Sequence, residues 1–164
     1  MATGMSGLAA RSGGRLATPA LDICRGATRV LGARGFASLS ELALANGRRA
    51  DIAAVSNNGA IWIVEVKSCV EDFRNDLKWP EYREYCDQLY FAVAPGFPSD
   101  VLPSDGGLIV ADRYGGDIIR PAPEHRLPAP RRKAMTLRLA RVAALRLQGA
   151  IDPEGNHQQW AEMA

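Results

Sequence analysis

The chain has 164 residues, of which 47% are hydrophobic and 23% are charged, and its formal net charge is +2 at pH 7. This length and composition are typical of one soluble globular domain with a single core. No apolar run approaches the ~20 residues of a membrane-spanning helix, and the N-terminal residues lack the apolar stretch of a secretory signal. We therefore expect a cytoplasmic protein with no membrane partner.

The N-terminal segment is basic and rich in small residues. Residues 1–18 contain Arg11 and Arg15 but no acidic residue, a composition that fits a transit peptide as well as a disordered leader. We favour the disordered leader, because its glycines and its lack of an apolar face disfavour an amphipathic helix. One domain is then expected over residues 19–150, followed by a tail over residues 151–164 without hydrophobic periodicity.

The cysteines and histidines argue against a zinc site and against a disulfide framework. Cys24, Cys69 and Cys86 form no close pair, and the histidines are His125 and His157. We expect the cysteines to be reduced and mostly buried.

Charge is distributed unevenly along the chain. Residues 1–50 carry seven basic and two acidic residues, residues 51–120 carry six and twelve, and residues 121–164 carry seven and four. An acidic middle between basic ends suits a carboxylate site that basic surroundings hold on a polyanion. Solvated surfaces could produce the same distribution.

The first predicted elements are a helix and three strands. The helix opens at Thr18-Pro19 and ends at Gly32 or Gly35. Residues 38–68 then alternate between apolar and polar residues in three short runs. The turn sequences NG (46–47) and NNG (57–59) separate these runs and favour the positive φ of hairpins, which predicts a three-stranded antiparallel meander.

Turn length decides which residues of the meander oppose one another. If Asn58-Gly59 alone formed the second turn, the side chains of Asp51 and Glu65 would point to opposite sides of the sheet. A three-residue loop with glycine in the third, left-handed place sets Asp51 directly opposite Glu65, and Gly59 favours this version. For the first hairpin we predict a two-residue turn, which pairs Glu41 with Ile52 and leaves Glu41 outside the site.

The third strand, IWIVEVKS at residues 61–68, carries two charges on one face. Glu65 and Lys67 share that face because side chains alternate along a strand, and a solvated face would explain them. Directly opposed residues, however, have Cβ atoms ~4.5–5.5 Å apart. The carboxylates of Asp51 and Glu65 could therefore share a divalent cation, without which they would repel each other. The sequence predicts a candidate metal site at this end of the sheet.

The hydrophobic period becomes helical after the meander. Val70, Phe73 and Leu77 predict a short helix on which Asp72 and Asp76 share a face. A second helical piece follows Pro80. Trp79, Tyr82 and Tyr85 could stack on unpaired bases. For the two tyrosines, helical spacing favours packing in the core instead.

The last third of the chain predicts two strand regions, a connector and a helix. Residues 89–95 read as a buried strand, and residues 107–112 and 117–120 read as a hairpin. Four prolines make residues 121–130 an extended connector. A final helix is expected over about residues 131–148. Its basic residues either hold phosphates or cover a helix surface.

Longer strings of the sequence resemble a known family. NGRRADIAAVS, IWIVEVKSCVEDFRNDLKWPEYREYCDQLYFAV and GLIVADRYGG are similar to the MmcB-like DNA repair proteins of bacteria. The order of elements, with Asp51 in the second strand and Glu65-Val66-Lys67 ending the third, resembles the PD-(D/E)XK nuclease-like superfamily, although Ala50 stands where the motif has proline. The resemblance implies an α/β, restriction-endonuclease-like core of αβββαβ order with a central mixed sheet flanked by helices.

The same resemblance implies a role in DNA repair, near the nucleoid, with DNA and other repair proteins as partners. A metal-dependent nuclease would use Mg²⁺ or Mn²⁺ held by Asp51, Glu65 and the carbonyl of Val66, with Lys67 orienting the attacking water or stabilising negative charge. Supporting residues would be Asp72, Asp76 and Lys78, and DNA-binding residues would be Arg48, Arg49, Arg131, Arg132, Lys133, Arg138 and Arg141.

Three alternatives stay open at this point. A nuclease fold without turnover could bind DNA or recruit repair partners, and an RNA-processing enzyme could use the same fold. Asp51 could also simply pair with Arg48 or Arg49 at the end of its strand.

Overall fold

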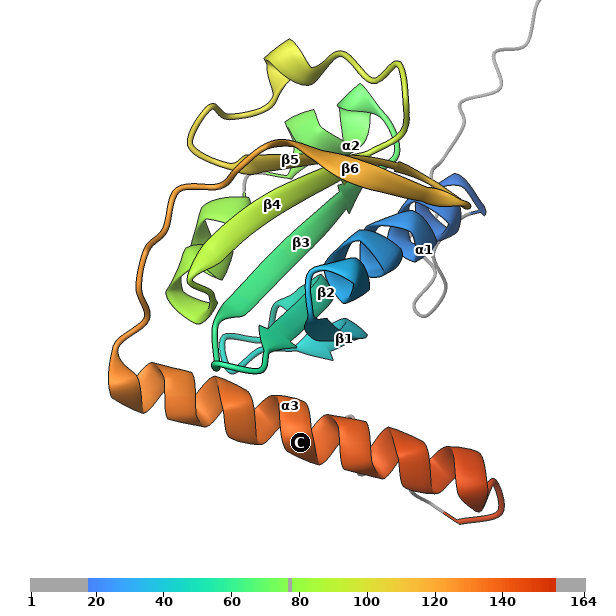
Figure 1. The fold of residues 1–164 in the computed structure, drawn as a ribbon, viewed down its shortest axis with the longest axis vertical. Helices are drawn as coiled ribbons and strands as arrows, with labels where there is room; N and C mark the ends of the chain where they lie inside the picture. Colours follow the sequence, from blue (N-terminus) through green and yellow to red (C-terminus); the bar gives the residue numbers. More distant parts are fainter. Residues whose placement is uncertain (1–17, 77, 156–164) are drawn as a thin grey trace, which may run out of the picture.

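A mixed six-stranded sheet forms the centre of the protein in the computed structural model, which describes residues 18–76 and 78–155 (Figure 1). The strands follow one another in space in sequence order, with antiparallel pairing from β1 to β3, parallel pairing from β3 to β5, and an antiparallel final pair. They are β1 (Phe36–Ala43), β2 (Arg49–Ser56), β3 (Ile61–Lys67), β4 (Gln88–Val93), β5 (Gly107–Asp112) and β6 (Gly115–Arg120).

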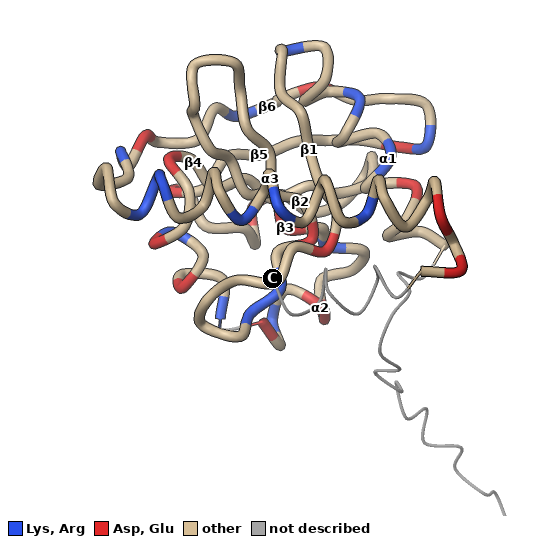
Figure 2. The backbone as a smooth tube through the Cα atoms, turned by 90° about the horizontal axis from the view of Figure 1, so that it is seen from below, with Lys and Arg blue, Asp and Glu red and all other residues tan. Residues whose placement is uncertain are grey.

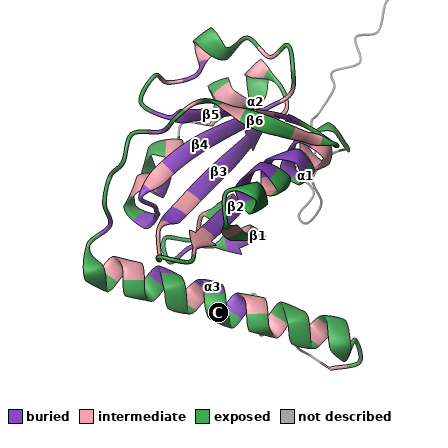
Figure 3. Ribbon diagram, viewed as in Figure 1, coloured by how far each residue is buried: buried purple, intermediate pink, exposed green. Residues whose placement is uncertain are grey.

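Helices cover both faces of this sheet. On one face α1 (Thr18–Ala33) packs on Ile52, Val64 and Tyr90. On the other face α3 (Ala129–Ile151) and the 3₁₀ segment η1 (Trp79–Tyr85) pack on Ala53, Ile61 and Ile63. Short segments over the β4–β5 side of the sheet complete this layer: α2 (Val70–Asn75) and η2 (Ser99–Val101). Figure 3 shows the central strands as almost continuously buried. Among the helices of the described residues, none has the combined length and hydrophobicity of a membrane-spanning segment.

Gly26 allows α1 to lie close to the β5–β6 hairpin. A Cβ atom at this position would lie 2.1 Å from the carbonyl oxygen of Asp112 and 2.6 Å from that of Gly115. Any larger residue would push the helix away from the sheet, so this glycine sets the distance between the two layers.

Both hairpins of the meander close with three-residue loops. Ser56 N donates to Ala60 O at 3.0 Å around the second loop, and Leu44 N donates to Arg48 O at 2.7 Å around the first. The third residue of each loop is a left-handed glycine, with φ of 78° at Gly47 and 83° at Gly59. The prediction for the second hairpin is therefore confirmed. The prediction for the first is wrong, because its loop contains one residue more than we expected.

The longer first loop moves Glu41 in register. Ser40 pairs with Ile52 and Leu42 pairs with Ala50, so Glu41 lies opposite Asp51 and not opposite Ile52. The residue that we excluded from the site is therefore the cross-strand neighbour of a predicted site residue.

Most other predicted elements are confirmed, with changed boundaries. The first helix, the meander, the buried fourth strand and the final hairpin are all present, and α3 is longer than expected at both ends. The predicted helix after β3 is cut short: α2 ends at Asn75, and Asp76 has φ −98° and ψ 82°, so Asp72 and Asp76 do not share a helical face. Leu77, the leader up to residue 17 and the tail from residue 156 lie outside the described residues. Cys24 and Cys86 are buried, Cys69 is exposed, and all three are free.

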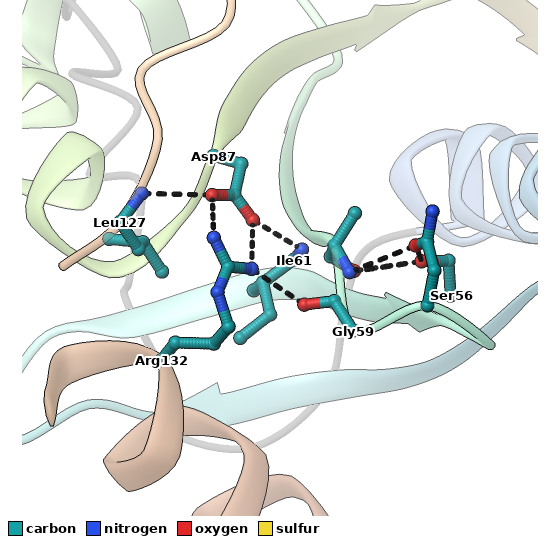
Figure 4. A network of polar contacts seen from close by, with 8 residues as sticks. Ser56, Gly59, Ile61, Asp87, Leu127 and Arg132 are labelled. Atoms are coloured by element: carbon teal, nitrogen blue, oxygen red, sulfur yellow. Dashed lines mark hydrogen bonds and ion pairs between the residues drawn. The ribbon is translucent and has the colours of Figure 1, made fainter. Parts of the chain in front are cut away.

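An ion pair between the buried Asp87 and the partly exposed Arg132 holds α3 on the sheet. Arg132 donates to both carboxylate oxygens of Asp87, at 2.6 and 2.7 Å, and to the carbonyl of Gly59 at 2.6 Å (Figure 4). The Asp87 carboxylate, on a residue only 3% exposed, also accepts the backbone N–H groups of Ile61 and Leu127. The interaction joins the start of β3, the end of the connector and the first turns of α3.

The same ion pair removes Arg132 from the predicted DNA-binding residues. Its guanidinium donates hydrogen bonds to the carboxylate of Asp87 and the carbonyl of Gly59. Although burial acts to raise the pKa of Asp87, the hydrogen bonds from Arg132 and the two backbone N–H groups hold it below its ordinary value.

We predict that Arg132→Met destabilises the protein by about 2–3 kcal/mol, because it leaves the Asp87 carboxylate buried without its cation. Urea unfolding followed by circular dichroism measures this loss. The matched control is Arg126→Met on the exposed part of the connector, which should shift the midpoint very little. Equal midpoints for the two variants would contradict the structural role of the pair.

Candidate metal and nuclease site

The strands β2 and β3 separate where the predicted site lies. Their regular pairing ends at Ile52 and Val64, and the next two residues along the same register are Asp51 and Glu65. Side chains replace the backbone ladder at this point: Asp51 N donates to Glu65 Oε1 at 3.3 Å, and Val66 N donates to Asp51 Oδ2 at 2.8 Å. Each carboxylate is therefore positioned by the backbone of the opposite strand.

Burial makes the two carboxylates costly to ionise. Glu65 is 3% exposed, and desolvation together with the nearby charge of Asp51 raises its pKa well above the ordinary value. Desolvation also raises the pKa of Asp51, against the opposing effects of the Val66 N–H and the Lys67 ammonium. The pair is thus an acidic site that gains from any cation placed beside it.

Lys67 lies between two acids at the end of β3. Its ammonium forms a hydrogen bond and an ion pair with Asp76, and lies 3.9 Å from Glu65 Oε2. Lys67 is only 5% exposed, so its position is set by the surrounding protein. Asp76 Oδ1 in turn accepts the N–H of Lys78 at 3.1 Å.

The predicted supporting residues therefore differ in what they do. Asp76 contacts Lys67 directly, and Lys78 acts on Asp76 through its backbone. Asp72 instead accepts a hydrogen bond from the hydroxyl of Ser68 on the exposed side of α2.

Glu41 is the site residue that the sequence analysis missed. It lies opposite Asp51, its carboxylate is 3.6 Å from Arg49, and its charge acts to raise the pKa of Asp51. Its φ of 54° is in the left-handed region, which is strained for a residue with a side chain. Such strain is concentrated at functional sites. Applying to Gly47 the turn rule that we used for Gly59 would have found this residue.

The strained residue also changes which side chains of β1 face the core. Leu39 and Leu42 are three residues apart, yet both contact the cluster beneath α3. In a regular strand they would point to opposite faces. The left-handed conformation of Glu41 therefore breaks the alternation at the level of Asp51.

The carboxylates retain oxygens that could bind a cation. Within residues 18–76 and 78–155, Asp51 Oδ1 and Glu65 Oε2 accept no hydrogen bond. The N–H and C=O of one strand residue point to the same side, so the carbonyl of Val66 faces β2, as its N–H does. Two carboxylates and a carbonyl fit Mg²⁺, which usually keeps several waters. The described part of the chain contains no cluster of three or more His, Cys, Asp or Glu side chains suited to a metal ion.

The arginines predicted to bind DNA have different surroundings. Arg48 forms a bidentate ion pair with Glu81, at 2.9 Å for both contacts, and Arg49 pairs with Glu41. On α3, Arg131 lies 3.5 Å from Glu84 and stacks over the ring of Tyr85. Arg138 donates to the carbonyl of Ala43. Lys133 and Arg141 form no ion pair with the described residues.

A groove lies between α3 and η1, on the sheet face that carries Glu65 and Lys67. Arg131, Arg138 and Arg141 line it together with Tyr85 and Ala45. The tyrosines of η1 are packed into the core, with Tyr82 7% and Tyr85 6% exposed, so the core interpretation of these residues is confirmed. The hydroxyl of Tyr82 donates to the carbonyl of Arg49, which ties η1 to the start of β2.

Comparisons with known proteins identify a family. The model of the MmcB-like family, described as DNA repair protein MmcB-like, matches residues 8–154. A solved structure of a protein of unknown function from Silicibacter pomeroyi is 42% identical and has a TM-score of 0.82; the alignment covers 85% of this chain and 96% of that one. No curated protein matches.

We predict that Glu65→Gln raises the melting temperature in chelator-treated buffer at neutral pH, by roughly 2–4 °C for each kcal/mol gained. The folded-state pKa of Glu65 lies above its value of 4.5 in the unfolded chain, so its ionisation costs stability as pH rises above that value. The difference in melting temperature between Glu65→Gln and wild type should therefore be small near pH 4.5 and grow toward neutral pH. A difference that stays constant or shrinks would contradict the burial of an ionised Glu65.

We also predict that Glu41→Gly is more stable than Glu41→Ala by about 1 kcal/mol, because glycine adopts positive φ without strain. Urea unfolding of both variants measures the difference. Ala37, an exposed residue of the same strand, provides the control: there, Ala37→Gly should destabilise. If alanine is the more stable residue at both positions, Glu41 is not strained.

Proposed function

Because the chain belongs to the MmcB-like family of DNA repair proteins, we propose that it is a divalent-metal-dependent nuclease that hydrolyses phosphodiester bonds in damaged or branched DNA. The observation that carries this proposal is the pair of buried carboxylates, Asp51 and Glu65, held in the gap between β2 and β3 with Lys67 beside them. Two such groups cost stability unless they serve a bound cation.

The local charge balance supports a cation at this position. Asp51, Glu65 and Asp76 bring three carboxylates around one ammonium, that of Lys67. Arg49 is nearby but pairs with Glu41. A divalent cation would compensate the excess negative charge and would relieve the repulsion between Asp51 and Glu65.

The observed order of helices and strands supports the superfamily part of this proposal. One helix precedes three antiparallel strands, and a helical segment then leads to a strand that pairs in parallel with β3. We include membership of the PD-(D/E)XK superfamily in the proposed function, with Ala50 in place of the motif's proline.

Different residues of this chain would have different roles in hydrolysis. Mg²⁺ or Mn²⁺, when bound, would lower the pKa of a bound water and bind phosphoryl oxygens. Asp51, Glu65 and the Val66 carbonyl would hold it. The ammonium of Lys67 would orient the attacking water or stabilise the negative charge that develops on the phosphate. Asp76 would fix the position of that ammonium through their ion pair.

Basic residues along α3 provide a path for the DNA backbone. Figure 2 shows Lys and Arg repeated along this helix, which lies across the molecule in that view. The groove lined by Arg131, Arg138 and Arg141 opens on the sheet face that carries the carboxylates. Phosphate contacts of this kind position the nucleic acid without selecting its sequence.

A second candidate function is a module that binds DNA or recruits repair partners without cutting. It is favoured by the absence, within the described residues, of a third acidic side chain placed to hold a metal with Asp51 and Glu65. Such a module would bind DNA in a salt-sensitive manner that persists when the carboxylates are removed.

We predict that the wild-type protein cuts single-stranded, nicked or forked DNA in Mg²⁺ or Mn²⁺, and that Glu65→Ala and Lys67→Met each lower the rate by about 10²-fold or more. Gel assays with labelled substrates measure cleavage. The matched control is Glu71→Ala on the exposed side of α2, which should cut at the wild-type rate. Absence of cleavage on every substrate, together with salt-sensitive binding by both site variants, would instead support the non-cutting module.

A further inference from the structure

The outward face of α3 carries an apolar stripe. Leu137, Leu147 and Ile151 are 58, 62 and 70% exposed, and they are three of the five large hydrophobic residues that are exposed within the described chain. Ala140 and Ala144 are also exposed and lie between them at spacings of three and four residues. We call these five residues the outer stripe: Leu137, Ala140, Ala144, Leu147 and Ile151.

The outer stripe is not needed to hold α3 on the protein. The opposite side of the helix already buries Met135, Leu139 and Val142 against the sheet. A helix docked by one face normally presents polar residues on the other. A second apolar line, with the spacing of a two-helix seam, indicates a surface that another helix covers.

The charges along α3 indicate which helix covers the outer stripe. The helix contains six basic residues and no acidic one, and the acidic residues lie beyond its C-terminal end, where Glu154 is exposed. Figure 2 shows this polarity, with basic residues along the helix and acidic residues in the turn that follows it. A second α3 in parallel orientation would place like charges together. In antiparallel orientation, the basic start of each helix, which contains Lys133, meets the acidic turn after the other helix, which contains Glu154.

We propose that the outer stripe binds the outer stripe of a second copy of this chain, antiparallel, with Ala144 near the two-fold axis. Leu137 of each copy then packs near Ile151 of the other, and the small side chains of Ala144 allow the helices to approach closely at the centre. The arrangement is isologous, as the interfaces of symmetric dimers are. It also sets the two helix dipoles in opposite directions.

The size of the stripe sets the strength of this dimer. It spans 14 residue steps of helix, or about 21 Å. A pair of such stripes buries roughly 1,000 Å² in total, at the lower limit for a specific interface. We therefore expect a reversible dimer with a Kd in the micromolar range. The proposal does not depend on nuclease activity, because the carboxylates are not part of the outer stripe; the groove borders the stripe and shares Leu137 with it.

Disulfide trapping tests the orientation directly. In a Cys69→Ser background, which removes the exposed native thiol, Ala144→Cys should form an intermolecular disulfide under mild oxidation, because the two thiols meet at the axis. Ala140→Cys is the matched control. It is equally on the stripe, but its two copies would be about 12 Å apart along the antiparallel helices, beyond disulfide reach. Equal trapping of both variants would indicate parallel pairing and would overturn the proposal.

Sedimentation velocity over about 5–500 μM protein tests the interface without oxidation. Wild type should show reversible association, and Leu147→Glu should stay monomeric throughout. Lys133→Glu should weaken the dimer about tenfold, and adding Glu154→Lys should restore it, since the exchanged charges face each other again. A wild-type protein that is monomeric at every concentration, or a charge exchange that fails to restore association, overturns the proposal.

Discussion

Two left-handed glycines determine how the acidic residues meet. Gly47 and Gly59 each occupy the third place of a three-residue loop, and each loop fixes the register of a hairpin. Because side chains alternate with a period of two, a loop shorter by one residue would turn every side chain of the next strand to the other face. The row of Glu41, Asp51 and Glu65 across three strands exists only because each loop has three residues.

The sequence contained enough information for much of this arrangement, and its limits have physical causes. Hydrophobic periodicity and turn residues located the meander, the buried fourth strand and the terminal helices, and the glycine rule placed Asp51 opposite Glu65. Glu41 was misplaced because Asn46-Gly47 is also the preferred two-residue turn, so the first loop looked complete without Ala45. The partnership of Arg132 with Asp87 joins segments 45 residues apart in sequence, and no local pattern reveals such a contact.

The buried charged residues of the site make the protein less stable than apolar residues would at the same positions. Glu65 and Lys67 are nearly inaccessible to solvent, and Asp51 interrupts the ladder between β2 and β3 with its own carboxylate. Apolar residues there would continue the sheet without the cost of burying charge. The backbone hydrogen bonds to Asp51 and Glu65 lower that cost without neutralising the charges, which leaves the pair rigid and still attractive to a cation.

The ion pair between Asp87 and Arg132 also links the docking of α3 to the pairing of β3 with β4. Asp87 accepts from the first residue of β3, from the end of the connector and from α3, so its full set of donors is present only after β3 and β4 lie side by side. The network around Asp87 is therefore complete only when α3 is docked on the paired strands. During synthesis, about 70 residues must follow β3 before the buried residues of α3 can complete the cover that η1 begins on this face of the sheet. Until then, part of that apolar face is exposed to other chains or chaperones.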